Sequence, residues 1–266
     1  MSGRRRRGYA GILDEAQLQF RDNAELERYY EEKYRGGGYE AGCVRFGINI
    51  SELYHVERHH AAFRAMAPQP GQVLLDAGCG TGRLAAQLAA SGAEVQAVDI
   101  AGNAFDPAHA AIAHLHFQKM NLEQLDFPDG TFDQIVCVEA LEHVLDPQRV
   151  LAEFRRTLKS AGRLVLSYPT VNRTAMQRLH RVLRIGRPIG ISEHLNEWSF
   201  AELREHVTAA GFRLRTAEGI VFDLGLLNGL KAVSRSFALG LTKFSLKIRR
   251  FPRNSLFVSA VFAKVG

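Results

Sequence analysis

Short apolar runs alternate with amphipathic segments through the middle of the chain. Four runs rich in Val, Ile and Leu have the length of buried strands, namely residues 73–77, 94–100, 134–138 and 163–168. Residues 83–90 and 149–158 lie between such runs and carry apolar side chains at helical spacing. Because each pair of parallel strands needs a crossover above the sheet, this alternation predicts an open, doubly wound α/β domain.

A helix and two further strands are predicted toward the C-terminal side. Residues 199–210 predict a helix with Ser199 as its N-cap and Gly211 as its C-terminal stop. Residues 212–216 and 256–263 have the apolar character of strands. These elements extend the α/β domain beyond the alternating region.

The N-terminal part is more charged and does not show the alternation of strands and helices. Residues 12–34 are charged and helix-prone, and they end at the three glycines 36–38, which predict a hinge. A second helical stretch, residues 53–66, ends before two prolines. We therefore divide the chain into an N-terminal helical lid or appendage, residues 1–69, and a main domain, residues 70–266.

Composition and charge narrow the class of protein. The chain has 266 residues, 46% of them hydrophobic, which excludes disorder of the bulk, and its net charge of +6 favours anionic partners. The scattered Cys43, Cys79 and Cys137 cannot form a disulfide framework and suit a reducing compartment. No apolar run is long enough to span a bilayer, and Asp14 and Glu15 interrupt the place of a secretory signal. We therefore predict a cytoplasmic protein.

A glycine-rich turn follows the first predicted strand and opens a helix. Gly78, Gly80 and Gly82 allow positive φ and a close approach of backbone to ligand, while the helix directs its N-terminal amides to the same place. A dinucleotide fingerprint would need a third glycine where Arg83 stands, and no phosphate-binding GxxxxGK[ST] motif is present. The turn therefore predicts a nucleotide-like cofactor other than a dinucleotide.

Two acids accompany the turn. Asp76 precedes it, and Asp99 closes the next strand, where a carboxylate can accept hydrogen bonds from ribose hydroxyls. Two carboxylates without a phosphate-binding lysine favour a cofactor that carries positive charge.

These motifs resemble the class I S-adenosylmethionine-dependent methyltransferases. The D-A-G-C-G-T-G of residues 76–82 is similar to the first motif of that family, and Asp99-Ile100 is similar to the acidic end of its second strand. The resemblance covers about residues 71–211 and implies S-adenosylmethionine as cofactor. It also implies a Rossmann-like, mostly parallel sheet of seven strands, whose last strand, residues 256–263, is antiparallel.

The resemblance continues after the third strand of the family. Asn121-Leu122-Glu123 is similar to the loop that usually places an acid against the adenine amino group, and the Asn121 carbonyl can accept that hydrogen bond, although a plain turn role stays open. The residues expected to bind the cofactor are Asp76, Gly78, Cys79, Gly80, Gly82, Asp99, Ile100, Asn121, Leu122 and Glu139.

The chemistry is expected after the strand 134–138. Glu139, Glu142 and His143 follow the carboxyl end of that strand, where open α/β sheets place their ligands. With His194 they form a donor set for Mg²⁺ or Zn²⁺, and they resemble the metal-binding ExxEH of ubiquinone-pathway O-methyltransferases and small-RNA 2′-O-methyltransferases. We favour the alternative without metal, in which His143 or His194 acts as general base, while a structural role for each histidine stays open.

Methyl transfer from a sulfonium depends on in-line approach in a water-poor pocket. Tyr29, Tyr30, Tyr34 and Tyr39 flank the glycine hinge and are candidates for a lid over the cofactor, with plain packing as the alternative.

Basic residues gather in two predicted inserts, at about residues 170–197 and 224–253. From residue 224 onward the chain has no acid, and cations alternate with apolar residues in a way that suits an anionic membrane surface, although the apolar face can equally cover the pocket. The cations of the two inserts are Arg173, Arg178, Arg181, Arg184, Arg187, Lys231, Arg235, Lys243, Lys247, Arg249, Arg250 and Arg253.

The sequence as a whole predicts a cytoplasmic S-adenosylmethionine-dependent methyltransferase, peripheral at the inner membrane face if the basic insert meets lipid. The expected acceptor is an oxygen of a metabolite or of a lipid-linked compound. An RNA-modifying methyltransferase is disfavoured because no recognised RNA-binding motif accompanies the charge. A non-catalytic protein that binds S-adenosylmethionine or a partner is the remaining alternative.

Overall fold

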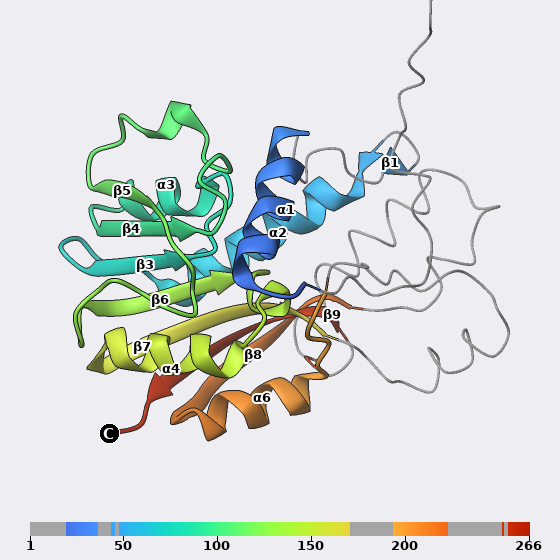
Figure 1. Ribbon diagram of the computed structural model, residues 1–266. Helices are drawn as coiled ribbons and strands as arrows, with labels where there is room; N and C mark the ends of the chain where they lie inside the picture. Colours follow the sequence, from blue (N-terminus) through green and yellow to red (C-terminus); the bar gives the residue numbers. More distant parts are fainter. Residues whose placement is uncertain (1–19, 37–43, 46–47, 171–193, 223–251, 253–254) are drawn as a thin grey trace, which may run out of the picture.

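The computed structural model describes residues 20–36, 44–45, 48–170, 194–222, 252 and 255–266, arranged around one central sheet (Figure 1). The sheet has seven strands in the order β5-β4-β3-β6-β7-β9-β8. Their bounds are Leu115–Lys119 for β5, Glu94–Asp99 for β4, Val73–Ala77 for β3, Phe132–Val138 for β6, Leu158–Pro169 for β7, Ser255–Lys264 for β9 and Phe212–Phe222 for β8.

The direction of the strands confirms the predicted sheet. Strands β5, β4, β3, β6 and β7 pair in parallel, whereas β9 is antiparallel to both of its neighbours, β7 and β8. The doubly wound α/β fold and its antiparallel last strand are therefore confirmed.

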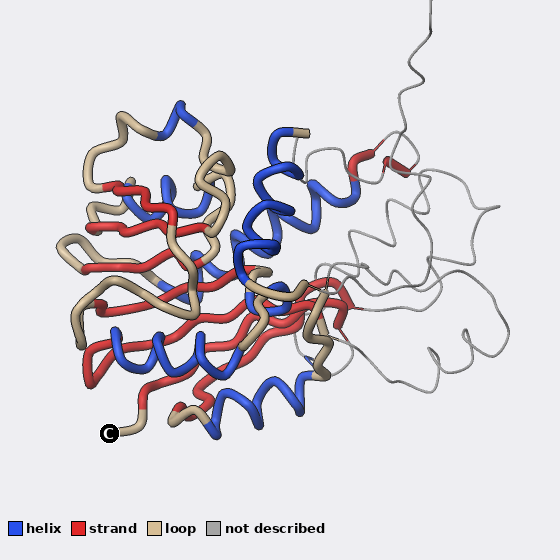
Figure 2. The backbone as a smooth tube through the Cα atoms, in the orientation of Figure 1, coloured by secondary structure: helices blue, strands red, loops and turns tan. Residues whose placement is uncertain are grey.

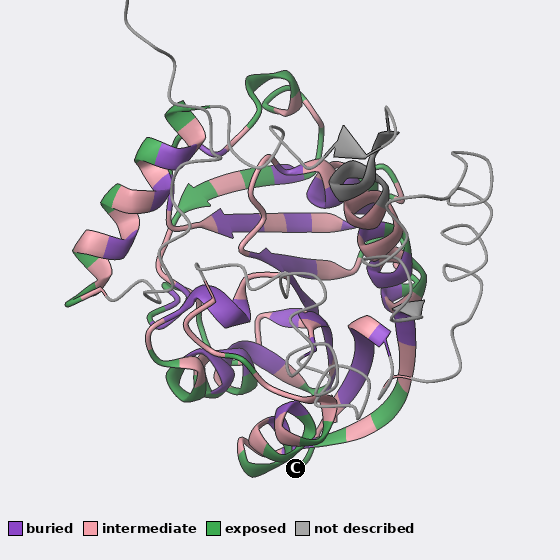
Figure 3. Cartoon of the chain, turned by 90° about the vertical axis from the view of Figure 1, so that its right-hand side faces the viewer, coloured by how far each residue is buried: buried purple, intermediate pink, exposed green. Residues whose placement is uncertain are grey.

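Helices cover both faces of the sheet, as Figure 2 shows. Helices α2 (Ile50–Met66) and α3 (Arg83–Ala89) bury Met66, Leu84 and Leu88 against one face. Helices α4 (Pro147–Thr157) and α6 (Phe200–Ala209) bury Phe154 and Leu203 against the other. Because successive residues of a strand point to opposite faces, Leu74 belongs to the first core and Leu75 to the second. Figure 3 shows buried residues along the central strands.

Several boundaries differ from the prediction. The apolar pattern did not indicate strand β5, because only Leu115 is buried in this edge strand; the resemblance alone implied a strand before Asn121. The short hairpin of β1 (Val44–Arg45) and β2 (Ile48–Asn49) was also not expected. Helix α6 has the predicted Ser199 cap, completed as a capping box by Glu202.

Helix α1 (Asn23–Arg35) begins at the Asp22 cap, later than the predicted residue 12, although residues 1–19 lie outside the described part. Its buried side packs on Ala101 and Ala104, which follow β4, so α1 lies at the carboxyl edge of the sheet (Figure 1). Within the described residues, no helix is both long and apolar enough to cross a membrane. The predicted domain boundary at residue 70 stays a prediction.

Candidate functional site

The glycine turn joins β3 to α3 in the conformation expected for it. Gly78, Gly80 and Gly82 have φ of 76°, 52° and 80°, a region that L side chains rarely adopt. A Cβ added at Gly78 would lie 2.4 Å from the Cβ of Ala140, which follows β6. The turn therefore closes tightly against the end of the neighbouring strand, and only glycine fits there.

Asp99 fastens the turn to the end of β4. Its carboxylate accepts hydrogen bonds from the Gly80 N–H at 2.9 Å and the Ala101 N–H at 3.0 Å. Burial raises the pKa of Asp99, and these N–H donors oppose that rise. A carboxylate has about four acceptor positions, so Asp99 can also accept bonds from a ligand in front of the turn.

Asp76 lies in β3 just before the turn and is only 2% exposed. Its Oδ2 has no hydrogen-bond partner within the described part of the chain. Burial, followed by the nearby Asp99, raises the pKa of Asp76 to about 7. A buried carboxylate oxygen without a donor fits a cationic ligand such as the amino-acid end of S-adenosylmethionine.

Cys79 belongs to the turn but has no sign of reactivity. Burial raises the pKa of its thiol well above the ordinary value, and the carboxylates of Asp99 and Asp76 act in the same direction. The thiol therefore stays protonated and serves as part of the wall of the turn.

The loop after β5 lies beside the turn. The Asn121 Oδ1 accepts a hydrogen bond from the Glu123 N–H at 2.9 Å, so this side chain shapes its own loop. Leu122 is buried, and its Cδ1 would lie 3.9 Å from a Cβ at Gly78. The adenine contact of Asn121 stays a prediction, for which the amide oxygen keeps a second lone pair.

Glu139 directly follows β6 and has a positive φ of 52°. Its carboxylate accepts hydrogen bonds from Arg58 Nη1 of α2 at 3.3 Å and from Ser167 Oγ of β7 at 3.1 Å. Burial raises the pKa of Glu139, and Arg58 opposes that rise. Sequence reasoning missed Arg58, because nothing in the sequence shows that residue 58 meets residue 139.

Glu142, His143 and His194 form the second cluster of the site. Glu142 lies in the short helix η4 (Leu141–His143), is fully buried, and has no hydrogen bond to either oxygen within the described residues. Its Oε1 lies 3.8 Å from His143 Nε2 and 4.0 Å from His194 Nε2. Backbone N–H groups of Leu195 and Asn196 donate to the Glu142 carbonyl, which fixes the loop that carries His194.

These three side chains fit a divalent cation. One ligand atom from each lies within 4.8 Å of the others, and neither oxygen of Glu142 has a hydrogen-bond partner within the described residues. Glu139 is not in this group, because Arg58 and Ser167 hold its carboxylate, and its part in the set of four possible ligands stays a prediction.

Aromatic residues of α1 cover this edge of the sheet. The Tyr30 ring meets the His143 ring edge-on, with centroids 5.8 Å apart. The Tyr34 hydroxyl would lie 3.0 Å from a Cβ at Gly80, so it stands directly over the turn. Tyr29 packs against Tyr30, whereas Tyr39 lies outside the described residues.

Polar contacts attach α1 to the sheet at two points. Lys119, at the end of β5, forms ion pairs of 2.6 Å with both Glu27 and Glu31. Glu123, only 7% exposed, accepts a hydrogen bond from Asn23 Nδ2 at 2.8 Å. Its other oxygen accepts from the backbone N–H groups of Leu145 and Asp146 at 3.1 and 2.9 Å. Glu123 belongs to the Asn121-Leu122-Glu123 motif of the sequence, but nothing in the sequence indicated its hydrogen bond to Asn23 of α1.

A protein-family model described as a methyltransferase domain matches residues 53–217. The chain belongs to this methyltransferase family. The chain is 31% identical over 169 residues to the ubiquinone biosynthesis O-methyltransferase of Xanthomonas euvesicatoria, covering 58% of this chain and 67% of that protein. It is 33% identical over 159 residues to the enzyme of the same name from Coxiella burnetii. That match covers 56% of this chain and 67% of that protein.

The fold of this methyltransferase recurs in a solved structure from Burkholderia thailandensis. That protein is 1,6-didemethyltoxoflavin-N1-methyltransferase with bound 1,6-didemethyltoxoflavin and S-adenosylhomocysteine. The two structures match with a TM-score of 0.61 and 18% sequence identity. The match covers 94% of this chain and 93% of that chain. The present chain is thus a methyltransferase by its family, and its likeness to this structure shows the shared fold.

The cations of the two inserts, Arg173 to Arg187 and Lys231 to Arg253, lie outside the described residues of this methyltransferase.

Proposed function

We propose that this methyltransferase transfers the methyl group of S-adenosylmethionine to an oxygen of a small-molecule acceptor. The observation that carries the proposal is the cluster of Glu142, His143 and His194, which follows the carboxyl end of β6 beside the glycine turn. The relatives named ubiquinone biosynthesis O-methyltransferase support oxygen as the acceptor atom.

The cofactor is proposed to lie against the turn and the ends of β4, β5 and β6. Asp99 would accept bonds from the ribose, while the bare oxygen of Asp76 would face the positive amino-acid end. The residues proposed to contact it are Asp76, Gly78, Cys79, Gly80, Gly82, Asp99, Ile100, Asn121, Leu122 and Glu139, all of which lie at this edge.

His143 and His194 are proposed as the groups that remove the acceptor proton. An imidazole titrates near neutral pH, and the buried Glu142 Oε1 lies 3.8 and 4.0 Å from the two rings, where it can orient them, although burial and Glu139 raise the pKa of Glu142. If a divalent cation binds, Glu142, His143 and His194 would hold it, and it would supply Lewis-acid activation of the acceptor hydroxyl. Apolar cover from α1 would exclude water, so positioning supplies much of the acceleration.

A cytoplasmic location, a lipid-linked acceptor and contact with an anionic membrane remain part of this proposal. They rest on the net charge of +6 and on basic inserts outside the described residues. Sedimentation with anionic vesicles that weakens as salt rises would support membrane contact, since salt screens exposed charges.

The deciding experiment uses S-adenosylmethionine with a ¹³C-labelled methyl group, the purified chain, and separate aqueous and lipid extracts. The chemical shift of the product methyl carbon distinguishes O-methyl from N-methyl and C-methyl. A labelled O-methyl product is expected, and its loss in a His143→Asn, His194→Gln double variant that still binds cofactor supports the assigned roles. Saturable cofactor binding without any labelled product would favour the non-catalytic alternative.

A further inference from the structure

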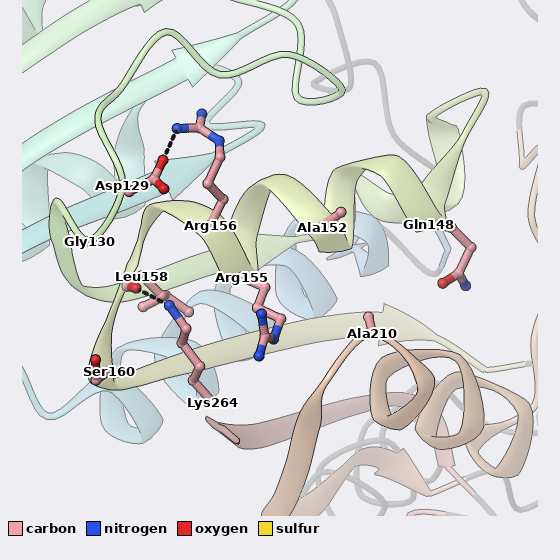
Figure 4. Close-up of a pocket in the computed structure, with 10 residues that line it drawn as sticks. All are labelled: Asp129, Gly130, Gln148, Ala152, Arg155, Arg156, Leu158, Ser160, Ala210 and Lys264. Atoms are coloured by element: carbon pink, nitrogen blue, oxygen red, sulfur yellow. Dashed lines mark hydrogen bonds and ion pairs between the residues drawn. The ribbon is translucent and has the colours of Figure 1, made fainter. Parts of the chain in front are cut away.

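A hollow opens at the amino edge of the sheet, opposite the edge that carries the glycine turn (Figure 4). It lies between α4, the start of β7 and the end of β9, and the side chains of Arg155, Arg156 and Lys264 line it. Nothing in the methyl-transfer site uses these residues.

One of the three cations is already neutralised. Arg156 donates to Asp129 at 2.9 Å and to Glu153 at 2.8 Å, so its charge is compensated within the protein. Asp129 is the one acid that lines the hollow among the described residues, and this ion pair engages it.

The other two cations have only carbonyl partners. Arg155 Nη2 donates to the Val265 carbonyl at 3.3 Å, and Lys264 Nζ donates to the Leu158 carbonyl at 2.6 Å. Neither forms an ion pair with a carboxylate in the described ranges. Burial lowers the pKa of Lys264, Arg155 lowers it further, and the carboxylate of Asp129 opposes this by raising it. The two positive charges therefore repel each other across the hollow, and a bound anion would remove that cost.

The backbone holds Arg155 in place. Gly211 has a φ of 89°, and a Cβ there would lie 2.4 Å from Arg155 Nε. The chain after α6 therefore passes directly against the guanidinium group, which limits its freedom before any ligand binds. Ser160, exposed on the rim, adds a hydroxyl donor.

We propose that this hollow binds a phosphate group through Arg155 and Lys264. Arg155 and Lys264 form no ion pair with a carboxylate in the described part of the chain, and the several oxygens of a phosphate can accept from guanidinium, ammonium and hydroxyl donors together. Inorganic phosphate, a soluble phosphate monoester and a phospholipid headgroup share this chemistry. The site is independent of the methyl-transfer site at the other edge.

The test is calorimetric titration of the full chain with inorganic phosphate and with glycerol 3-phosphate, alongside sedimentation with vesicles that contain phosphatidic acid. Saturable binding of one or both soluble probes supports a small-molecule site, and vesicle binding that Arg155→Gln abolishes supports a headgroup site. Arg155→Gln and Lys264→Gln are each expected to weaken binding about tenfold or more, the loss of one charge-assisted hydrogen bond. The control is Arg204→Gln, at an exposed arginine outside the hollow, which is expected to leave affinity unchanged.

Three results would overturn the proposal. These are absence of saturable binding of all three probes, affinity that neither variant changes, and an equal loss in the Arg204→Gln control. Cofactor binding by each variant reports on its fold. If Lys264→Gln fails to fold because its bond to the Leu158 carbonyl is lost, Arg155→Gln at an exposed position decides the outcome alone.

Discussion

The Gly80 N–H donates a hydrogen bond to the Asp99 carboxylate across 2.9 Å, and this bond joins the glycine turn to the end of the neighbouring strand. Asp99→Ala is expected to weaken S-adenosylmethionine binding at least tenfold, because the turn loses its tether and the ribose loses its acceptor. Calorimetric titration checks this. Asp126→Ala, at an exposed acid outside the site, is the control, and equal affinities for the two variants would contradict the assignment.

Gly78 and Gly130 form a matched pair for testing the tightness of the turn. Both have positive φ, at 76° and 65°, but a Cβ at Gly78 would lie 2.4 Å from the Ala140 Cβ, whereas nothing lies within 4 Å of one at Gly130. Gly130→Ala is expected to cost about 1 kcal/mol of unfolding free energy from backbone strain alone. Gly78→Ala is expected to cost clearly more and to abolish cofactor binding, as denaturant titration and calorimetry would show. Similar losses in both variants would mean that the contact with Ala140 is unimportant.

The raised pKa of Asp76 predicts that the unfolding free energy depends on pH when no cofactor is bound. Its pKa rises from 3.8 to about 7 on folding, so between these values the folded state holds the proton more tightly than the unfolded state. Unfolding free energy therefore falls as pH rises through this window, by up to about 4 kcal/mol. Asp76→Asn removes this group, so its unfolding free energy is expected to fall less between pH 4 and pH 8. Denaturant titrations across this range check the slope, and parallel curves for the two proteins would refute the prediction.

Glu123 is expected to control whether α1 stays docked. Glu123→Ala removes the acceptor of three N–H bonds at a buried position, with an expected cost of about 1–3 kcal/mol. Hydrogen exchange should accelerate across residues 23–35, while protection of the inner strand β3 is kept. Asp126→Ala again provides the control. Unchanged exchange in α1 would show that the apolar contacts of Leu26 and Tyr30 hold the helix by themselves.

The preference for a metal-free mechanism gives a separate prediction. Activity is expected to survive exhaustive chelation, because an imidazole is sufficient as base. His143→Asn is expected to lower kcat by about 10²-fold or more with little effect on the KM for cofactor. Loss of activity on chelation with recovery on adding Zn²⁺ or Mg²⁺ would instead assign Glu142, His143 and His194 to a metal centre.

Local patterns predicted those parts of the fold whose interactions are near in sequence. Each of three features has a signal in its own stretch of sequence and lies in the element predicted for it. They are the apolar strand before Gly78, the N-cap Ser199 of helix α6, and Asp99 at the end of strand β4. Strand β5 had no such signal, because an edge strand with one buried residue need not be apolar.

The contacts that complete the site are distant in sequence and could not be predicted. Arg58 reaches Glu139 across 81 positions, and Asn23 reaches Glu123 across 100. Arg58 and Ser167 hold the Glu139 carboxylate, so it lies outside the group of Glu142, His143 and His194, a separation that the ExxEH spacing does not show. Spacing along the chain specifies which residue types are available, but the tertiary fold decides which of them meet.

The place of β9 between β7 and β8 has a consequence for biosynthesis. Both neighbours are translated before it, so a nascent chain that has reached only residue 222 carries them without the strand that joins them. Two strand edges then stay open to wrong partners on the ribosome until residues 255–264 leave the exit tunnel. The sheet between β7 and β8 therefore closes only after residues 255–264 are free to pair with both.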